Sequence, residues 1–293
     1  MQSTQFICSV TLTLMLAACS DKQAPAAVSV PAAVANAPAS APPEETRASL
    51  MKAVFGKQYR PATKDALATL PMHEDRKQLR LYVVVPLTST TLENGDTVLV
   101  AQADYSPENA EENYIGTDSI GLINVYLLRS VAGEWKVLKR HENLVYRGDN
   151  DRPGSVLFTK LAKGKPGLAI VNGGKSEFGC IRESVLLYEL GDDPMRELTE
   201  GITSKSILDA ACEADSSGGY WSISSKWHFA TPKKPAAYDD LIMVFSGDKS
   251  SPPVNSDGVA GAVVASKVQA TARYAYDGKQ YRLVSGVNPI GER

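Results

Sequence analysis

The sequence predicts a mainly β protein with one short helix at the start of its folded body. Three observations carry this prediction. Beyond residue 71 the chain consists of runs of five to nine residues rich in Val, Ile, Leu and Tyr, bounded by Gly, Asp, Asn and Pro. Polar turn residues separate several of these runs, as they do in antiparallel hairpins. Helical periodicity is confined to the residues before 71.

The first expected element is a helix over Glu44–Phe55. Acidic residues open its first turn, apolar side chains gather on one side, and Gly56 follows as a stop signal. A second, shorter helical turn is expected over residues 63–70.

Strands are expected in the rest of the body. Their ranges are 80–85, 97–103, 122–129, 135–140, 155–161, 167–171, 184–190, 220–229 and 241–245, followed by a closing pair.

Three hairpins stand out among these strands. They are expected over 124–139 around Ala132-Gly133, over 184–198 around Gly191-Asp192-Asp193, and over 272–284 around Asp277-Gly278. Asp-Gly suits a type I′ turn, which needs positive φ at both central residues. The uneven spacing of the hairpins does not support a strict repeat. We expect an irregular propeller-like body, with a large β-sandwich or barrel as the alternative.

The charges of the chain exclude one class of function. Its 31 basic and 33 acidic residues give a formal net charge of −2, and neither sign forms a long block. A nucleic-acid-binding protein needs clustered Lys and Arg to displace counterions. We therefore expect no nucleic-acid partner.

An uncharged stretch near the N-terminus, residues 7–18, has the length of a signal-peptide apolar region. It is too short to span a bilayer, which takes roughly 20 apolar residues. The stretch ends in Leu16-Ala17-Ala18-Cys19-Ser20, which resembles the lipobox of bacterial lipoproteins.

That resemblance implies a lipoprotein signal peptide over residues 1–18, cleavage before Cys19, and lipidation of Cys19 by a diacylglycerol and an amine-linked acyl chain such as palmitate. Multiple acyl chains give stable membrane anchoring. In Gram-negative lipoproteins Asp after the cysteine marks inner-membrane retention, so Ser20 implies an outer-membrane, periplasm-facing protein.

A tether is expected between the anchor and the body. Residues 21–43 contain nine Ala and five Pro, a composition that behaves as an extended linker. We expect residues 19–43 to join the anchor to a single β-rich periplasmic domain over residues 44–293.

Two cysteines remain in the body, Cys180 and Cys212. As an even pair in an exported protein, they are predicted to form a disulfide bond. A metal site is the weaker alternative, because neither lies in a CxxC and no histidine lies near either of them in sequence.

Three further patterns bear on binding. Asp149 and Asp151 begin like a calcium loop, but the bidentate Glu of an EF-hand is missing, so they are a weak metal candidate and no cofactor is expected. Trp221 and Trp227 are an even number apart, so they would share one face of a strand. Tyr274 lies in a stretch that faintly resembles the tyrosine-bearing region of periplasmic lysozyme inhibitors.

These features predict a cell-envelope lipoprotein with a non-catalytic binding or scaffold role. Its partners would be the membrane, through the acyl chains, and an envelope protein. A periplasmic inhibitor or immunity lipoprotein against a lysozyme-like or toxic effector is one alternative, and an envelope hydrolase is another. The sequence has no nucleophile-elbow GxSxG and no evident triad, so no enzyme is expected.

Overall fold

The computed structural model divides the chain into two units, Met1–Ala35 and Asn36–Arg293. The residues that the structure describes all lie in the second unit: 44–73, 75–106, 121–145, 148–149, 152–175, 180–208, 220–232, 236–251 and 264–290. The predicted signal peptide, Cys19 and the tether therefore lie outside the described residues. Within the described residues, no helix has the length and apolar character needed to cross a bilayer.

Helix α1 (Glu44–Phe55) has the predicted bounds, and a short 3-10 turn, η1 (Gly56–Gln58), follows it. Gly56 has a φ of +56°, a conformation that favours glycine and ends the helix. Leu50 and Met51 are fully buried, and Val54 and Phe55 are nearly so. The helix is therefore amphipathic and uses one side for packing.

The N-terminal half of the body forms a six-stranded sheet, the small sheet, in which each strand pairs with its chain neighbour in antiparallel fashion. Its strands are β1 (Tyr59–Arg60), β2 (Asp65–Pro71), β3 (Leu79–Thr91), β4 (Thr97–Tyr105), β5 (Leu122–Val131) and β6 (Glu134–His141).

Strand β2 corrects the sequence interpretation, which expected a helical turn over residues 63–70. The alanines favour helix by propensity, but Ala66, Ala68 and Leu70 alternate with less buried neighbours and face the core. They pack in the same cluster as α1. The period of two in burial, set by the sheet, overrides the local helix preference.

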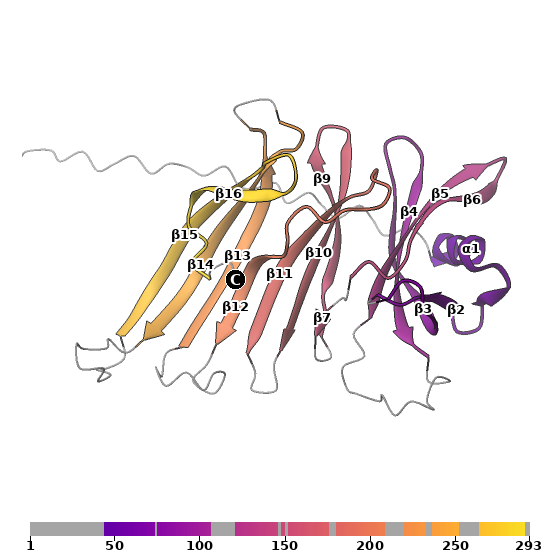
Figure 1. Cartoon of the computed structure of the whole chain (residues 1–293), viewed down its shortest axis with the longest axis horizontal. Coiled ribbons are helices and arrows are strands. Elements are labelled where there is room, and N and C mark those ends of the chain that lie inside the picture. Colours follow the sequence, from indigo (N-terminus) through magenta and orange to yellow (C-terminus); the bar gives the residue numbers. More distant parts are fainter. Residues whose placement is uncertain are drawn as a thin grey trace, which may run out of the picture. The chain divides into compact units, whose positions relative to one another are not determined.

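The C-terminal half forms a ten-stranded sheet, the large sheet (Figure 1). Its strands are β7 (Gly148–Asp149), β8 (Arg152–Pro153), β9 (Ser155–Ala162), β10 (Lys165–Lys175), β11 (Ile181–Glu189), β12 (Ile202–Leu208), β13 (Tyr220–Ala230), β14 (Asp240–Ser251), β15 (Val264–Tyr276) and β16 (Tyr281–Gly286). From β9 to β16 every strand is antiparallel to the next.

A shared apolar cluster joins the two sheets. Val98 and Val100 of β4 and Ile123 and Val125 of β5 meet the side chains of β10 and β11, among them Ile170. The alternate residues of β4, including Leu99, pack against α1 instead. Because both faces of β4 are buried, its sequence Thr-Val-Leu-Val-Ala is a continuous apolar run, as is typical of doubly covered strands.

Two of the three predicted hairpins are confirmed. Ala132 (φ +53°) and Gly133 (φ +83°) form the two-residue turn between β5 and β6. At Asp277-Gly278 the hairpin is present, but the loop has four residues instead of the expected two, since Tyr276 pairs with Tyr281. The Asp277 carboxylate accepts hydrogen bonds from two backbone N–H groups of that loop, which explains the longer turn.

The hairpin expected over residues 184–198 is only half present. The chain turns back after β11, but its return arm makes a single bridge, Tyr188 to Glu197, and the next true strand is β12, which the sequence did not predict. The peptide bond between Asp193 and Pro194, which is cis, lies in the turn that joins β11 to this arm.

The predicted mainly β class, with antiparallel hairpins and a short N-terminal helix, is confirmed. The arrangement of the strands differs from the propeller-like one. A propeller repeats separate four-stranded blades, whereas the described strands form two continuous sheets in which successive hairpins extend the same ladder.

Candidate binding face of the large sheet

Strand β13 separates its side chains into an apolar side and a polar side. Trp221, Ile223, Trp227 and Phe229 belong to or pack against one apolar cluster. The intervening residues are exposed: Ser222, Ser224, Lys226 and His228. The prediction that Trp221 and Trp227 share a face is therefore confirmed, as expected for positions an even number apart.

Half of this apolar face is tightly covered. Met243 and Phe245 of β14 are fully buried there, and Tyr238, from the loop before β14, packs over the same cluster. The chain after β16 also crosses this face: the Asn288 amide donates to the backbone oxygen of Thr203 at 3.1 Å and to the Tyr274 hydroxyl at 3.0 Å.

A network of polar side chains holds the Tyr238 loop in place. The Tyr238 hydroxyl donates to the Glu189 carboxylate, and the Lys165 ammonium lies 3.1 Å from that carboxylate. The same ammonium makes a cation–π contact with the Tyr238 ring, 4.7 Å from the ring centre. Burial, followed by the hydrogen bond to Glu189, raises the pKa of Tyr238 above its ordinary value. Tyr238 therefore stays neutral, and its hydroxyl donates the hydrogen bond that holds this loop over the apolar face.

Other side chains of this face are only half-buried. We call them the tryptophan face; they are Val171, Trp221, Trp227, Phe229, Val268 and Ala270. Trp227 and Phe229 stand beside the buried Met243 and Leu241, whereas Trp221 stands beside the exposed Lys249. The residues of the tryptophan face border the buried cluster without being enclosed by it. An aromatic and aliphatic row of this kind is a candidate binding surface, although packing against the core accounts for part of each side chain.

Gly247 interrupts the side chains of this face on β14. It stands between Ile223 on β13 and Val268 on β15. Val268 is half-buried, whereas Ile223 is only 2% exposed. A Cβ at Gly247 would lie 2.0 Å from the backbone oxygen of Ser222, so the sheet geometry here requires glycine.

Polar groups border the face around Trp221. The Lys249 ammonium lies 5.2 Å from the Trp221 ring centre, and the Trp221 indole N–H donates to the Ser206 hydroxyl at 3.0 Å. The Ser225 hydroxyl has no hydrogen-bond partner among the described residues, but it is enclosed beside Phe245, so it is no contact point for a ligand on the surface.

A glycine-lined depression adjoins the face at the ends of β10 and β11. Val171, a member of the tryptophan face, lines it together with Gly154, Ser155, Gly173, Gly174, Ile181 and Glu183. The Gly173-Gly174 pair lies inside β10, where a Cβ on Gly173 would come within 2.4 Å of the backbone oxygen of Arg182. The Glu183 carboxylate is held by the Lys205 ammonium at 2.8 Å.

Tyr274, the third residue suggested by the sequence, is a core residue. Its side chain is 1% exposed, and its hydroxyl accepts the hydrogen bond from Asn288. It is buried because it occupies an inward position of β15, beside Leu241 of β14. Because Tyr274 is buried, it does not belong to the candidate binding face, in contrast to the half-buried Trp221 and Trp227.

Only one cysteine of the predicted disulfide, Cys180, lies among the described residues. Cys180 directly precedes β11, and Cys212 lies outside the described residues. Ile181 pairs with Ile207, so Cys180 stands beside Leu208, the last residue of β12. The chain leading to Cys212 therefore begins next to Cys180, which is consistent with the pairing; the bond itself stays a prediction.

The weak calcium candidate gains no ligand set. Asp149 lies in β7, and Asp151 lies outside the described residues. In the described part of the chain, no three His, Cys, Asp or Glu residues gather closely enough to hold a metal ion.

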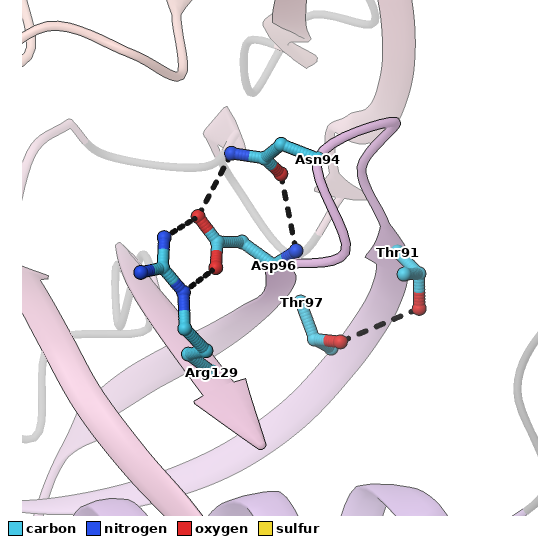
Figure 2. Close-up of polar contacts among 5 residues, drawn as sticks. All are labelled: Thr91, Asn94, Asp96, Thr97 and Arg129. Atoms are coloured by element: carbon cyan, nitrogen blue, oxygen red, sulfur yellow. Dashed lines mark hydrogen bonds and ion pairs between the residues drawn. The ribbon is translucent and has the colours of Figure 1, made fainter. Parts of the chain in front are cut away.

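A second polar cluster lies at the β3–β4 turn of the small sheet (Figure 2). The Arg129 guanidinium donates to both oxygens of Asp96, at 2.6 and 2.9 Å, and the Asn94 amide donates to Asp96 at 2.9 Å. The hydroxyls of Thr91 and Thr97 are 3.3 Å apart across the hairpin. The hydrogen bond from Arg129 holds the pKa of Asp96 below its ordinary value, against the effect of burial. This cluster fastens a turn.

Sequence reasoning found the two tryptophans but missed the rest of the face. Val171, Val268 and Lys249 join it from other strands through the register of the sheet. The signal that was present in the sequence was Gly247, which follows the apolar run 241–245 within the same strand, since an isolated glycine in a strand marks a close approach or a bend.

Comparison of the chain with known protein families, with characterised proteins and with solved structures found no match.

Proposed function

We propose that the chain is a lipoprotein of the outer membrane whose periplasmic body binds an amphiphile, an apolar chain with an anionic group, on the tryptophan face. The observation that carries the proposal is the half-buried tryptophan face, with the Lys249 ammonium 5.2 Å from the Trp221 ring centre. The role is one of binding and not of catalysis.

The chemistry of the face favours such a ligand. An apolar chain laid on this face would contact the half-buried Trp221 and Val268, and removing apolar surface from water contributes about 25 cal/mol per Å². An anionic group next to Lys249 would gain a charge-assisted hydrogen bond. The anchor supports the same conclusion, since a protein tethered by acyl chains works next to amphiphiles.

The anchor is tested with the full-length chain in a Gram-negative host. Labelling with an alkyne analogue of palmitate is expected to mark the wild type and Cys8→Ala but not Cys19→Ala, because only Cys19 stands at the predicted cleavage point. In fractionated envelopes, Ser20→Asp is expected to move the protein to the inner membrane. Label that persists in Cys19→Ala would overturn the anchor.

The face is tested with residues 36–293, which include every described element. The probes are cis-parinaric acid and its uncharged methyl ester, measured by fluorescence. Trp221→Ala is expected to weaken both probes by about tenfold, the equivalent of about 1.4 kcal/mol. Lys249→Gln is expected to weaken only the acid.

Trp135→Phe serves as the matched control. Trp135 packs against the cluster around α1 and not on the tryptophan face, so its loss should leave both affinities unchanged. Saturable binding of neither probe, or unchanged binding in Trp221→Ala, would contradict the proposed ligand and would favour an apolar protein segment as the partner.

A further inference from the structure

Strand β15 is longer than the strand that covers its outer edge. β15 runs over Val264–Tyr276, but β16 pairs only with its last five residues, starting at Ala272. No other strand in the described part of the chain pairs with the first half of β15 on that side. Natural proteins usually protect such an edge, because it is a template for pairing with another strand.

A glycine ends the pairing of β16 with β15. Gly286 has a φ of +80°, and a Cβ there would lie 1.9 Å from the backbone oxygen of Thr271. The same oxygen accepts a hydrogen bond from the Val287 N–H at 3.0 Å, the last contact before the chain leaves the edge. Glycine thus ends the covering strand at a fixed point.

The direction of the backbone groups on this edge follows from that contact. The Thr271 carbonyl points outward, away from β14, and in a strand the residues at every second position point the same way. Gln269 and Ala265 therefore present their N–H and C=O groups outward. The side chains of Val268 and Ala270 remain on the tryptophan face, so edge pairing and that face use different groups.

We propose that the β15 edge pairs with the β15 edge of a second copy of this chain, in antiparallel register about a two-fold axis at Val268. Opposing residues must share a face of the sheet, so the axis passes through a residue. At Val268 the axis places Lys267 opposite Gln269 of the other copy, whereas at Lys267 it would place two lysines face to face, which is unfavourable.

The side chains along the β15 edge suit pairing with the same edge of a second copy. Lys267 is its only charged side chain, and it pairs with Asp248 of the same chain at 2.6 Å. At the ends of the edge stand Val264 and Val287, which are 59% and 61% exposed. About this axis Ser266 faces Ala270 of the other copy, and the ladder ends there, because the outer side of Thr271 and Ala272 already pairs with Val287 and Gly286. Val264 of one copy then lies beyond the end of the ladder, next to Val287 of the other.

The register predicts one specific cross-link. Val268 and its copy form a pair that exchanges no backbone hydrogen bonds, with Cα atoms about 4.5 Å apart, within the range that a disulfide bridges. In intact cells that express the full-length chain, Val268→Cys treated with copper phenanthroline is expected to run as a dimer on a non-reducing gel. Ser266→Cys, which faces Ala270 of the other copy, is the matched control and should stay monomeric.

A second pair of variants tests the backbone. Gln269→Pro removes an outward N–H and should reduce the Val268→Cys cross-link at least fivefold, whereas Gln269→Ala keeps the N–H and should leave it unchanged. Circular dichroism of both variants checks that they are folded. No dimer from Val268→Cys, equal cross-linking from Ser266→Cys, or a Val268→Cys dimer that Gln269→Pro leaves unchanged would each overturn the proposal. These outcomes are independent of amphiphile binding, which is read by the probes.

Discussion

The two sheets of this protein are built in the same way and covered differently. Both consist of antiparallel strands, apart from a short parallel pairing of β7 with β10 in the large sheet, but the small sheet closes one face with α1, whose Leu50 and Met51 are fully buried. The large sheet covers only part of its apolar face, with the Tyr238 loop and the segment around Asn288. One face of the small sheet is therefore closed by a helix, whereas some apolar side chains of the large sheet, among them Trp221 and Val268, stay half-buried.

The difference lies in the chain that each sheet has available as a cover. A helix of twelve residues presents a continuous apolar side. The covers of the large sheet are loops, held by polar contacts such as the hydrogen bond from the Asp239 N–H to the Leu161 oxygen at 2.7 Å. These loops leave Trp221 and Val268 half-buried.

The largest effect is expected from a cavity made under α1, the helix that covers the small sheet. Leu50→Ala removes a fully buried side chain of α1 and should lower the free energy of unfolding by about 3 to 5 kcal/mol. Chemical denaturation followed by circular dichroism measures it. Leu138→Ala on β6, where the side chain is 43% exposed, is the control with little expected change. Equal losses in both variants would contradict the role given to the helix.

The second effect concerns the large sheet. If Cys180 and Cys212 are joined, the bond closes a loop of about 32 residues, and its loss in Cys212→Ser should cost about 3 to 4 kcal/mol by loop entropy. Thiol titration of the denatured, unreduced protein checks the bond directly. Two free thiols from the body would show that the large sheet is held without this cross-link.

The sequence allowed prediction of those parts of the fold that local chemistry determines. The bounds of α1 follow from its acidic first turn and from Gly56, and the β5–β6 turn follows from Ala132-Gly133. Strand β2 was missed because alanines favour helix in isolation, and their strand conformation is imposed by packing against α1. Local helix propensity fails to predict the conformation where packing against an element distant in sequence determines it.

The candidate site was predictable only along a single strand. The shared face of Trp221 and Trp227 follows from their even spacing, which involves β13 alone. Lys249 and Val268 reach the same face through pairing registers that no local pattern determines. Tyr274 showed the converse: its sequence neighbourhood suggested a binding residue, and the register placed it in the core.

A third effect tests how the large sheet ends. Gly286→Ala places a methyl group against the Thr271 oxygen and in an unfavourable backbone conformation, so we expect a loss of about 2 to 3 kcal/mol in the free energy of unfolding. Gly278→Ala is the matched control: its φ is also positive, at +103°, but no atom lies within 4 Å of its added Cβ. A loss no greater than that of Gly278→Ala would show that the close contact contributes nothing.

The smallest effect concerns the turn that fastens the small sheet, and it depends on pH. Because the hydrogen bond from Arg129 keeps the pKa of Asp96 below its ordinary 3.8, the ionised carboxylate stabilises the folded state above about pH 4. That stabilisation is lost as the pH falls through the lowered pKa of the folded state. Asp96→Asn should therefore cost about 1 to 2 kcal/mol at pH 7 and close to nothing at pH 2.

Denaturation curves at both pH values measure the difference. Asp277→Asn is a useful control from the large sheet, because Asp277 also has a lowered pKa, but its hydrogen bonds come from the backbone of an exposed loop. Arg129→Ala should reproduce the pH dependence of Asp96→Asn, since both remove the same ion pair. If Asp96→Asn loses as much stability at pH 2 as at pH 7, the contribution of Asp96 is one of packing, and the β3–β4 turn is not fastened by charge.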